Sequence, residues 1–461
     1  MTFSALDSEL LGPLFATDAM RACFSDRALL GAMLAAEAAL ARAEAGLGLA
    51  PEALAGAIAA IRPESLDRAA LGRQAAVAGV PTIPFVKAVQ ARLPPELERA
   101  FHKGATTQDI LDTAFALRAR DALALVAAEL DAILGGLARL AEAHRATPCA
   151  GRTYGQQAAP VTFGFKAAVW LAGVAEAAAR LPAVRARLLV ASLGGPVGTL
   201  AGLGAQGGAQ GPAVLDAFAR ELALGTTPLA WHARRGRVAE AGAWLAETMG
   251  ALAKMATDVA HLASTEVGEV AEPYMPGRGG SSAMPHKRNP VSSTVILAAF
   301  AAAKGHAMTL LDSMAVLHER PVGAWHAEWH ALPSLFGLAS GALREARALA
   351  EGLAVHPGRM RDNLALTRGL LFADAAAARL GERLGRERAH ALVERAVAAV
   401  RDEEGVTLLA ALERMPEAGE AGAGADLAGA FDLGPAVAAS SPWIDRALDA
   451  AARARALLLE G

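Results

Sequence analysis

The chain of 461 residues contains few of the residues that define several common protein classes. Its two cysteines, Cys23 and Cys149, cannot form a disulfide framework and lack the spacing of a zinc site. The first ten residues, MTFSALDSEL, include acidic side chains where a secretory signal would carry basic ones. We therefore expect a protein of the reducing cytoplasm.

Lysine is also scarce, because only six of the 44 basic residues are lysines. With 47 acidic residues the net charge is −3, so no strongly basic face is expected and no nucleic-acid partner. The longest uncharged run, between Arg187 and Asp216, contains repeated glycine and two prolines, which favours irregular backbone over a membrane span. Hydrophobic residues make up 54% of the chain, which excludes a disordered protein and suits two or three folded domains.

Helical spacing of apolar residues dominates the pattern, and strand-like alternation is scarce. We expect long helices over residues 109–144, 160–190, 238–262, 290–314 and 328–353, with Pro160 at the start of the second. Shorter helices broken by proline and glycine are expected at both ends of the chain. The sequence thus predicts an all-α protein with a helical domain at 1–108, a long-helix bundle at 109–355 and a helical domain at 356–461.

Three polar segments between the long helices are candidate sites. The first, HKGATTQD at 102–109, precedes the first long helix. Thr106 or Thr107 could simply cap that helix, or these hydroxyls and the free backbone N–H groups could bind a carboxylate. The second, RTYGQQ at 152–157, combines hydroxyl and amide groups, and is either a capped loop or part of a site.

The third segment, PGRGGSSAMPHKRNP at 276–290, is the most informative and is called the signature loop below. Its glycines make it mobile, and two serines offer hydroxyl groups. Four cationic or titratable side chains fall within it, in a chain that is otherwise slightly acidic: Arg278, His286, Lys287 and Arg288. Together with the dipole of a helix beginning near Pro290, such a loop suits a substrate with several carboxylates.

These segments resemble the conserved motifs of the fumarase/aspartase superfamily. GSSAMPHKRNP is similar to the family's signature loop, GATTQDILDTA to its first conserved segment and RTYGQQAAPVTFGFK to its second, in the family's order. The resemblance extends over essentially the whole chain. It implies a three-domain, almost entirely helical protomer. It also implies a homotetramer around a twenty-helix core, in which each active site takes the three segments from three different subunits.

Within the superfamily, AGVPTIPFVKAV at 78–89, HERPVGAWHAEW at 318–329 and the N-terminal stretch look most like the bacterial carboxymuconate cycloisomerases of protocatechuate catabolism. One departure supports this branch. The lyases usually carry histidine where this chain has Tyr154, and that histidine is linked to protonating the leaving group. Lactone formation and its reversal need no such acid, because a carboxylate leaves without a proton.

The resemblance assigns the acid/base role to Ser281, with Ser282 as the alternative. It implies that Lys287 and Asn289 hold the carboxylate that takes up charge in the reaction. A second carboxylate would be bound by Thr106, Thr107 and Gln108 from another subunit, and Tyr154 and Gln156 would contact the substrate from a third. The remaining carboxylate is a weaker expectation for Arg320. Trp325 and Trp329 could line the site or belong to the core, and His102 and His326 stay open possibilities.

The expected substrate is a small polycarboxylate, and the sequence contains no metal-ligand cluster and no dinucleotide fingerprint, so no cofactor is expected. Two alternatives stay open. One is adenylosuccinate lyase or another fumarate-releasing lyase, since adenylosuccinate lyase shares GSSAMPHKRNP closely. The other is a non-catalytic structural protein on the same scaffold, against which the intact signature loop argues.

Overall fold

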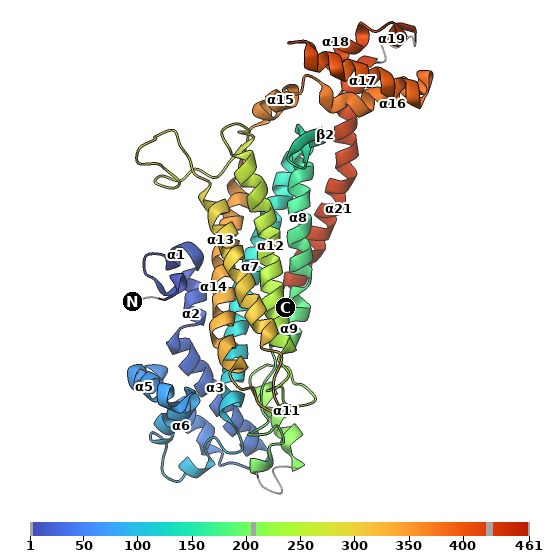
Figure 1. Cartoon of the computed structure of the whole chain (residues 1–461). Coiled ribbons are helices and arrows are strands. Elements are labelled where there is room, and N and C mark those ends of the chain that lie inside the picture. The colour runs from blue at the N-terminus through green and yellow to red at the C-terminus, as the bar shows by residue number, and fades with distance from the viewer. Residues whose placement is uncertain (1–2, 204–208, 421–426, 460–461) are drawn as a thin grey trace.

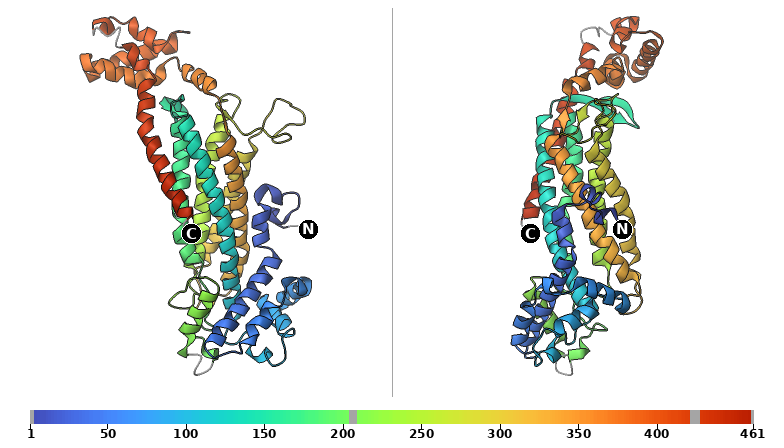
Figure 2. Two further views of the ribbon diagram at one scale, coloured as in Figure 1. Left: turned by 180° about the vertical axis from the view of Figure 1, so that it is seen from behind. Right: turned by 90° about the vertical axis from the view of Figure 1, so that its left-hand side faces the viewer.

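The protein is described from a computed structural model that covers residues 3–203, 209–420 and 427–459. The molecule is elongated, with a long helix bundle between two smaller helical parts (Figures 1 and 2). Helices dominate, as the sequence predicts. Residues 5–15 lie beside the middle of the bundle in Figure 1, the rest of the N-terminal part reaches its lower end, and residues 357–420 lie at the upper end.

The bundle is built from long helices that pack along one another: α7 (Thr107–Ala143), α8 (Phe163–Ala179), α12 (Gly236–Leu262), α13 (Val291–Asp312) and α14 (Ala324–Gly352). One large core of leucine, alanine, valine and methionine side chains joins them. These bounds agree with the five expected stretches except the second. Pro333 lies inside α14, near the N-terminal third of that helix.

The second stretch differs from the prediction, which placed Pro160 at a helix start. Pro160 instead lies in strand β2 (Gln156–Thr162), which pairs antiparallel with β1 (Pro148–Thr153). A two-stranded ribbon has only edge strands, where proline is tolerated. Helix α8 begins three residues later, and the Thr162 hydroxyl caps it by accepting from the Phe165 N–H at 3.1 Å.

The N-terminal part begins with η1 (Ala5–Asp7) and α1 (Gly12–Phe15), which lie beside the middle of the bundle (Figure 1). The lower part then contains the 21-residue helix α3 (Asp26–Gly46), which follows α2 (Asp18–Cys23), and the shorter elements α4 (Ala53–Ala59), η2 (Pro63–Ser65), α5 (Arg68–Ala78), α6 (Thr82–Gln90) and η3 (Glu98–Ala100). Its core also takes in Leu193, Leu203 and Phe218 from the long connection between α9 (Leu181–Leu188) and α12. That connection carries η4 (Ala201–Leu203) and α11 (Gly211–Glu221). Two stretches far apart in sequence therefore form one packing unit at this end.

The upper part contains α15 (Pro357–Ala365), η5 (Leu370–Phe372), α16 (Ala373–Leu384), α17 (Arg386–Asp402), α18 (Leu408–Glu413), α19 (Pro416–Glu420) and η6 (Ala428–Phe431). A separate small core holds α16, α17 and α18 together. The last helix, α21 (Gly434–Leu459), is longer than the short helices expected here, because Ile444, Ala451 and Leu458 pack into the main core alongside α8.

Two helical stretches, Phe163–Leu188 and Val291–Asp312, are long and apolar enough to cross a membrane by length and composition alone. Both belong to the bundle, where core helices of soluble proteins have the same composition. A third of the apolar window in α13 is buried within the protomer, and Met308 and Leu311 on this helix are exposed. The bundle thus presents apolar surface that a single chain does not cover.

Candidate active site

Arg320, just before α14, meets the first polar segment at the lower end of the bundle. Its guanidinium donates to the Thr106 hydroxyl at 2.9 Å and to the Thr107 hydroxyl at 3.1 Å, and its Nε lies 3.4 Å from the Gln108 side-chain oxygen. Among the described residues it forms no ion pair with a carboxylate. These four residues are called the lower cluster. It is a half-buried cation held by neutral oxygens, which suits it to an external carboxylate.

The lower cluster is held in place by Asp109, which is fully buried. Its carboxylate accepts hydrogen bonds from the backbone N–H groups of Thr106, Gly194 and Gly195, each at 2.9 Å, and lies 2.6 Å from His232 Nε2. A Cβ at Gly195, where φ is +67°, would lie 2.6 Å from the Gly104 carbonyl oxygen. Only glycine therefore fits where this loop crosses the first segment.

Gln108 is fully buried and its amide is already committed. It donates to the backbone carbonyl of His232 at 3.1 Å and lies 3.3 Å from the Asp112 carboxylate. In this arrangement Gln108 orients Arg320 rather than reaching a substrate. Thr106 and Thr107 accept from Arg320, which leaves their O–H groups free to donate.

A buried ion network lies one helical turn further along α7, toward the middle of the bundle. Arg235 donates to Asp112 at 2.7 and 3.1 Å and forms a close ion pair with Glu328. The Trp325 indole donates to the same Asp112 at 3.0 Å. Trp325 is buried, so it belongs to the core, whereas Trp329 is 37% exposed. His326 is exposed and lies 3.1 Å from the Gly79 carbonyl.

The second segment forms the tip of the β1–β2 hairpin, at the opposite end of the bundle (Figure 1). Tyr154 and Gly155 both have positive φ, at 52° and 77°, which is the backbone pattern of a type I′ turn. This turn places the Tyr154 ring fully in solvent, and Gln156 is also exposed. Arg152 fixes the hairpin to the bundle through a bidentate ion pair with buried Glu269, at 3.0 and 2.5 Å.

The signature loop begins and ends at two carboxylates that the sequence reasoning missed. Glu272 accepts from the backbone N–H groups of Ser292 and Ser293, both at 2.8 Å, and so caps α13 where Pro290 cannot. The dipole of this helix, expected to attract substrate, already faces a carboxylate of the chain itself. Arg278 pairs with Glu345, a buried carboxylate on α14 that also accepts from the Ser292 hydroxyl at 2.8 Å.

Beyond these stems the loop has few contacts. The Asn289 N–H donates to the Gly279 carbonyl at 2.8 Å and closes the loop, and Ser281 Oγ accepts from the Met284 N–H at 3.2 Å. Most of its side chains are exposed: Ser282, Ala283, Met284, Pro285, His286, Lys287, Arg288 and Asn289. Arg288 stacks over the Tyr274 ring at 4.9 Å. The loop is thus tied at its base and open at its tip.

The three segments do not meet within one chain. The hairpin tip and the signature loop lie at the upper end of the bundle, and the lower cluster lies at the other end (Figure 1). Helix α13 alone, with 22 residues, separates the end of the loop from the connecting segment that carries Arg320 by about 33 Å. Arg320, Thr106 and Thr107 are brought together, but Ser281, Lys287 and Tyr154 stand apart from them.

The chain is similar in sequence and in fold to known lyases and cycloisomerases. A family model described as "Lyase" matches residues 14–305. A 3-carboxy-cis,cis-muconate cycloisomerase from Pseudomonas aeruginosa is 47% identical over 84% of each chain. The crystal structure of 3-carboxy-cis,cis-muconate lactonizing enzyme from Pseudomonas putida superimposes with a TM-score of 0.90 at 42% identity, covering 97% of this chain and all of that one. This chain belongs to the fumarase/aspartase superfamily of lyases.

A third relative from this lyase family aligns in sequence with a larger share of this chain than the Pseudomonas aeruginosa cycloisomerase does. It is a nitrosuccinate lyase from Streptomyces davaonensis, 44% identical over 98% of this chain and 96% of its own length. The resemblance read from the motifs is therefore confirmed at the level of the superfamily. The roles given to individual residues stay predictions.

Some residues that hold the site of this lyase family gave only a weak signal in the sequence. Asp109 was visible only as a first-turn acid, and two of its three backbone donors come from a loop 85 and 86 residues later. Glu272 and Glu345 are isolated glutamates with no motif of their own. Their importance appears only when the folded chain brings Ser292 and Arg278 to them.

Proposed function

We propose that this protein interconverts 3-carboxy-cis,cis-muconate and its carboxymuconolactone in protocatechuate catabolism. The observation that carries the proposal is the similarity to the Pseudomonas putida lactonizing enzyme, which extends over 97% of this chain and the whole of that one. The hairpin tip supports it, because the chain carries Tyr154 where the fumarate-releasing lyases usually carry the histidine linked to protonating the leaving group.

In the lactonising direction, a carboxylate oxygen of the substrate attacks an alkene carbon and forms the ring C–O bond. The electron pair of the double bond moves to the neighbouring carbon and is delocalised into the carboxylate attached there. The Ser281 hydroxyl then donates its proton to that carbon. In the reverse direction, the Ser281 alkoxide removes the proton and the ring carboxylate leaves.

Ser281 needs stabilisation as an alkoxide for this role, since a free serine is a very weak base. The Met284 N–H, already 3.2 Å from its oxygen, supplies one hydrogen bond. Lys287, six residues along the same loop, supplies positive charge when the loop closes over substrate. Lys287 and Asn289 then hold the carboxylate that takes up charge, with Ser282 beside them.

A substrate with three carboxylates needs partners beyond the loop, and the lower cluster is suited to bind one of them. Its Arg320 has no carboxylate partner among the residues described. Since the two ends of one chain are far apart, we place the complete site between subunits of a cytoplasmic homotetramer. The exposed Met308 and Leu311 of α13, with Val169 of α8, are suited to the contacts between bundles.

A second candidate reaction is the cleavage of nitrosuccinate. The relative of that name matches 98% of this chain, against 84% for the Pseudomonas aeruginosa cycloisomerase. Nitrite, like a carboxylate, is the anion of a fairly strong acid and leaves without a proton. The presence of Tyr154 in place of the family's histidine therefore argues against a reaction that expels an amine. It does not distinguish a reaction that expels nitrite from one that expels a carboxylate.

Purified protein should be given each substrate separately. We expect 3-carboxymuconate to lose its diene absorbance without release of fumarate, and nitrosuccinate to yield no nitrite. Adenylosuccinate serves as the control for an amine leaving group. The proposal is contradicted if nitrosuccinate releases nitrite, or adenylosuccinate releases fumarate, faster than 3-carboxymuconate loses its diene absorbance. Either result would assign the protein to the fumarate-releasing lyases.

A further inference from the structure

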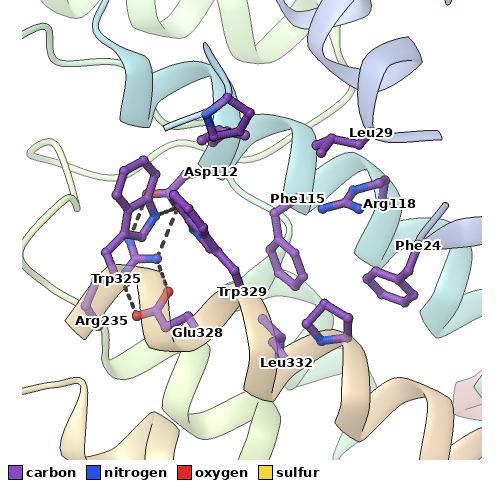
Figure 3. A pocket seen from close by; sticks show the side chains of 13 residues that line it. Phe24, Leu29, Asp112, Phe115, Arg118, Arg235, Trp325, Glu328, Trp329 and Leu332 are labelled. Carbon is purple, nitrogen blue, oxygen red and sulfur yellow. Dashed lines mark hydrogen bonds and ion pairs between the residues drawn. The ribbon is translucent and has the colours of Figure 1, made fainter. Parts of the chain in front are cut away.

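A cavity of about 280 Å³ lies between α7 and α14, near the start of α3. No residue of the lower cluster or of the signature loop lines it, but its wall includes Asp112, Arg235 and Glu328 of the buried ion network. Figure 3 shows aromatic and aliphatic side chains on most of its wall. Phe115 and Leu111 come from α7, Trp329 and Leu332 from α14, and Phe24 from the turn before α3. The volume approaches that of small-ligand sites and exceeds that of cavities that hold a single benzene ring.

Arg118 points into this cavity with its charge unpaired (Figure 3). Among the described residues it forms no ion pair and no hydrogen bond, and its buried Nε has no partner. Its guanidinium stacks 5.4 Å from the centre of the Phe24 ring. Burial lowers its pKa to about 10, and Asp26 opposes that shift only in part, so the group is still a cation near neutral pH. Arg118 is half-buried, and a partly desolvated cation without a carboxylate partner is unfavourable unless a ligand compensates it.

The other charged groups on the wall are paired with one another. Arg235 is clamped between Asp112 and Glu328, and burial raises the pKa of Glu328, which weakens any net negative charge in that network. Asp112 is six residues from Arg118 along α7, or about 9 Å along the helix axis. The cavity therefore has one anion-binding end at Arg118 and an apolar, aromatic remainder.

We propose that this cavity is a binding site for a monocarboxylate carrying a single aromatic ring, separate from the site of the lyase reaction. The carboxylate would pair with the Arg118 guanidinium, and the ring would lie between Phe115, Trp329 and Leu332. A planar ring suits walls of flat side chains, and a single negative charge matches the single unpaired cation. The site is independent of which reaction the protein catalyses.

The test uses benzoate as the probe and the full-length protein. Titration calorimetry and thermal unfolding should show binding to the wild type and a rise in melting temperature. The neutral benzamide, of the same shape, should bind at least about tenfold more weakly, because it cannot pair with Arg118. Arg118→Met should weaken benzoate binding by a similar factor, whereas the exposed Arg139→Met on the same helix should leave it unchanged.

Two further arms separate this cavity from the lower cluster, whose Arg320 could also attract benzoate. Binding should persist in Arg320→Gln if the cavity is the site, and be lost there if the lower cluster is. The proposal is overturned by equal binding of benzamide, by undiminished binding in Arg118→Met, by loss confined to Arg320→Gln, or by no binding to the wild type. The benzamide comparison decides the question even where a variant fails to fold.

Discussion

Both ends of the bundle carry a cationic side chain beside hydroxyl groups, but these groups are fixed by hydrogen bonds at the lower end and are largely exposed at the upper end. At the lower end, Arg320 is fixed by three side-chain oxygens, and buried Asp109 ties the segment beneath it to a distant loop through three backbone hydrogen bonds. At the upper end, Ser281 accepts one backbone hydrogen bond and Lys287 is exposed. One end is preorganised to bind charge, and the other has to be ordered before it can react.

The difference fits what the proposed function requires of each end. Binding a carboxylate is strongest where the cation is already oriented, because no ordering entropy is lost. In the proposed mechanism, Ser281 needs an altered pKa only while substrate excludes water around it. The loop stems are nevertheless firm, since Glu272 and Glu345 hold Ser292, Ser293 and Arg278. Movement is thereby confined to the tip between Gly279 and Asn289.

The largest expected effect comes from the tip itself. We expect Ser281→Ala to lower turnover by about 1,000-fold or more, since it removes the group that transfers the proton. Ser282→Ala is the matched control and should reduce turnover by about tenfold or less. Steady-state kinetics measure both, with size-exclusion chromatography to check assembly. The reverse ranking would move the acid/base role to Ser282.

Mixing two defective variants tests whether the two ends meet across subunits. Arg320→Gln should reduce kcat/KM by about 100-fold through loss of a charged hydrogen-bond pair. If each site takes its loop and its lower cluster from different chains, tetramers co-expressed in equal amounts from Ser281→Ala and Arg320→Gln should recover about a quarter of wild-type activity. Activity that stays at the mean of the two single variants would mean that one chain supplies both ends.

The long helices and the three polar segments at the two ends of the bundle could be predicted from the sequence, because helix periodicity and short motifs are local features. Thr106, Thr107 and the signature loop were found as segments, and Arg320 was added only through a resemblance. Their grouping was not predictable, since Arg320 and Thr106 are 214 residues apart and meet through the return of α13. Pro160 was wrongly placed in a helix because periodicity does not distinguish a short edge strand from a helix start.

Buried charges were the other feature beyond reach of the sequence. Gln108 looked like a substrate contact, yet its complete burial commits it to Asp112, His232 and Arg320. Glu272 belongs to no motif in the sequence. Its role appears only in the fold, where it accepts from the first backbone N–H groups of α13, which the N-cap residue Pro290 cannot cap. In each case the partner lies on another element, so the assignment depends on tertiary packing rather than on local pattern.

The smallest expected effect concerns stability at the lower end. Burial, together with the nearby Glu37 carboxylate, raises the pKa of Glu44 to about 8. Burial lowers the pKa of His102, but Glu37, 2.6 Å away, outweighs it and the net pKa is raised. Both groups hold protons more tightly in the folded state than in the unfolded state. The free energy of unfolding should therefore fall as pH rises from about 5 to about 8, and stay level above that.

Glu44→Gln removes the ionisation with the larger pKa shift, so its melting temperature should exceed that of the wild type by a few degrees at about pH 9 and by less at about pH 6. Glu52→Gln, an exposed site on the same domain, is the control and should follow the wild type at both values. Because Glu44 is buried in the N-terminal core and is not part of the lower cluster, the variant should not change the pH dependence of turnover. An altered pH profile of kcat would show that this buried acid is coupled to the lower cluster and, through it, to the chemistry at Ser281.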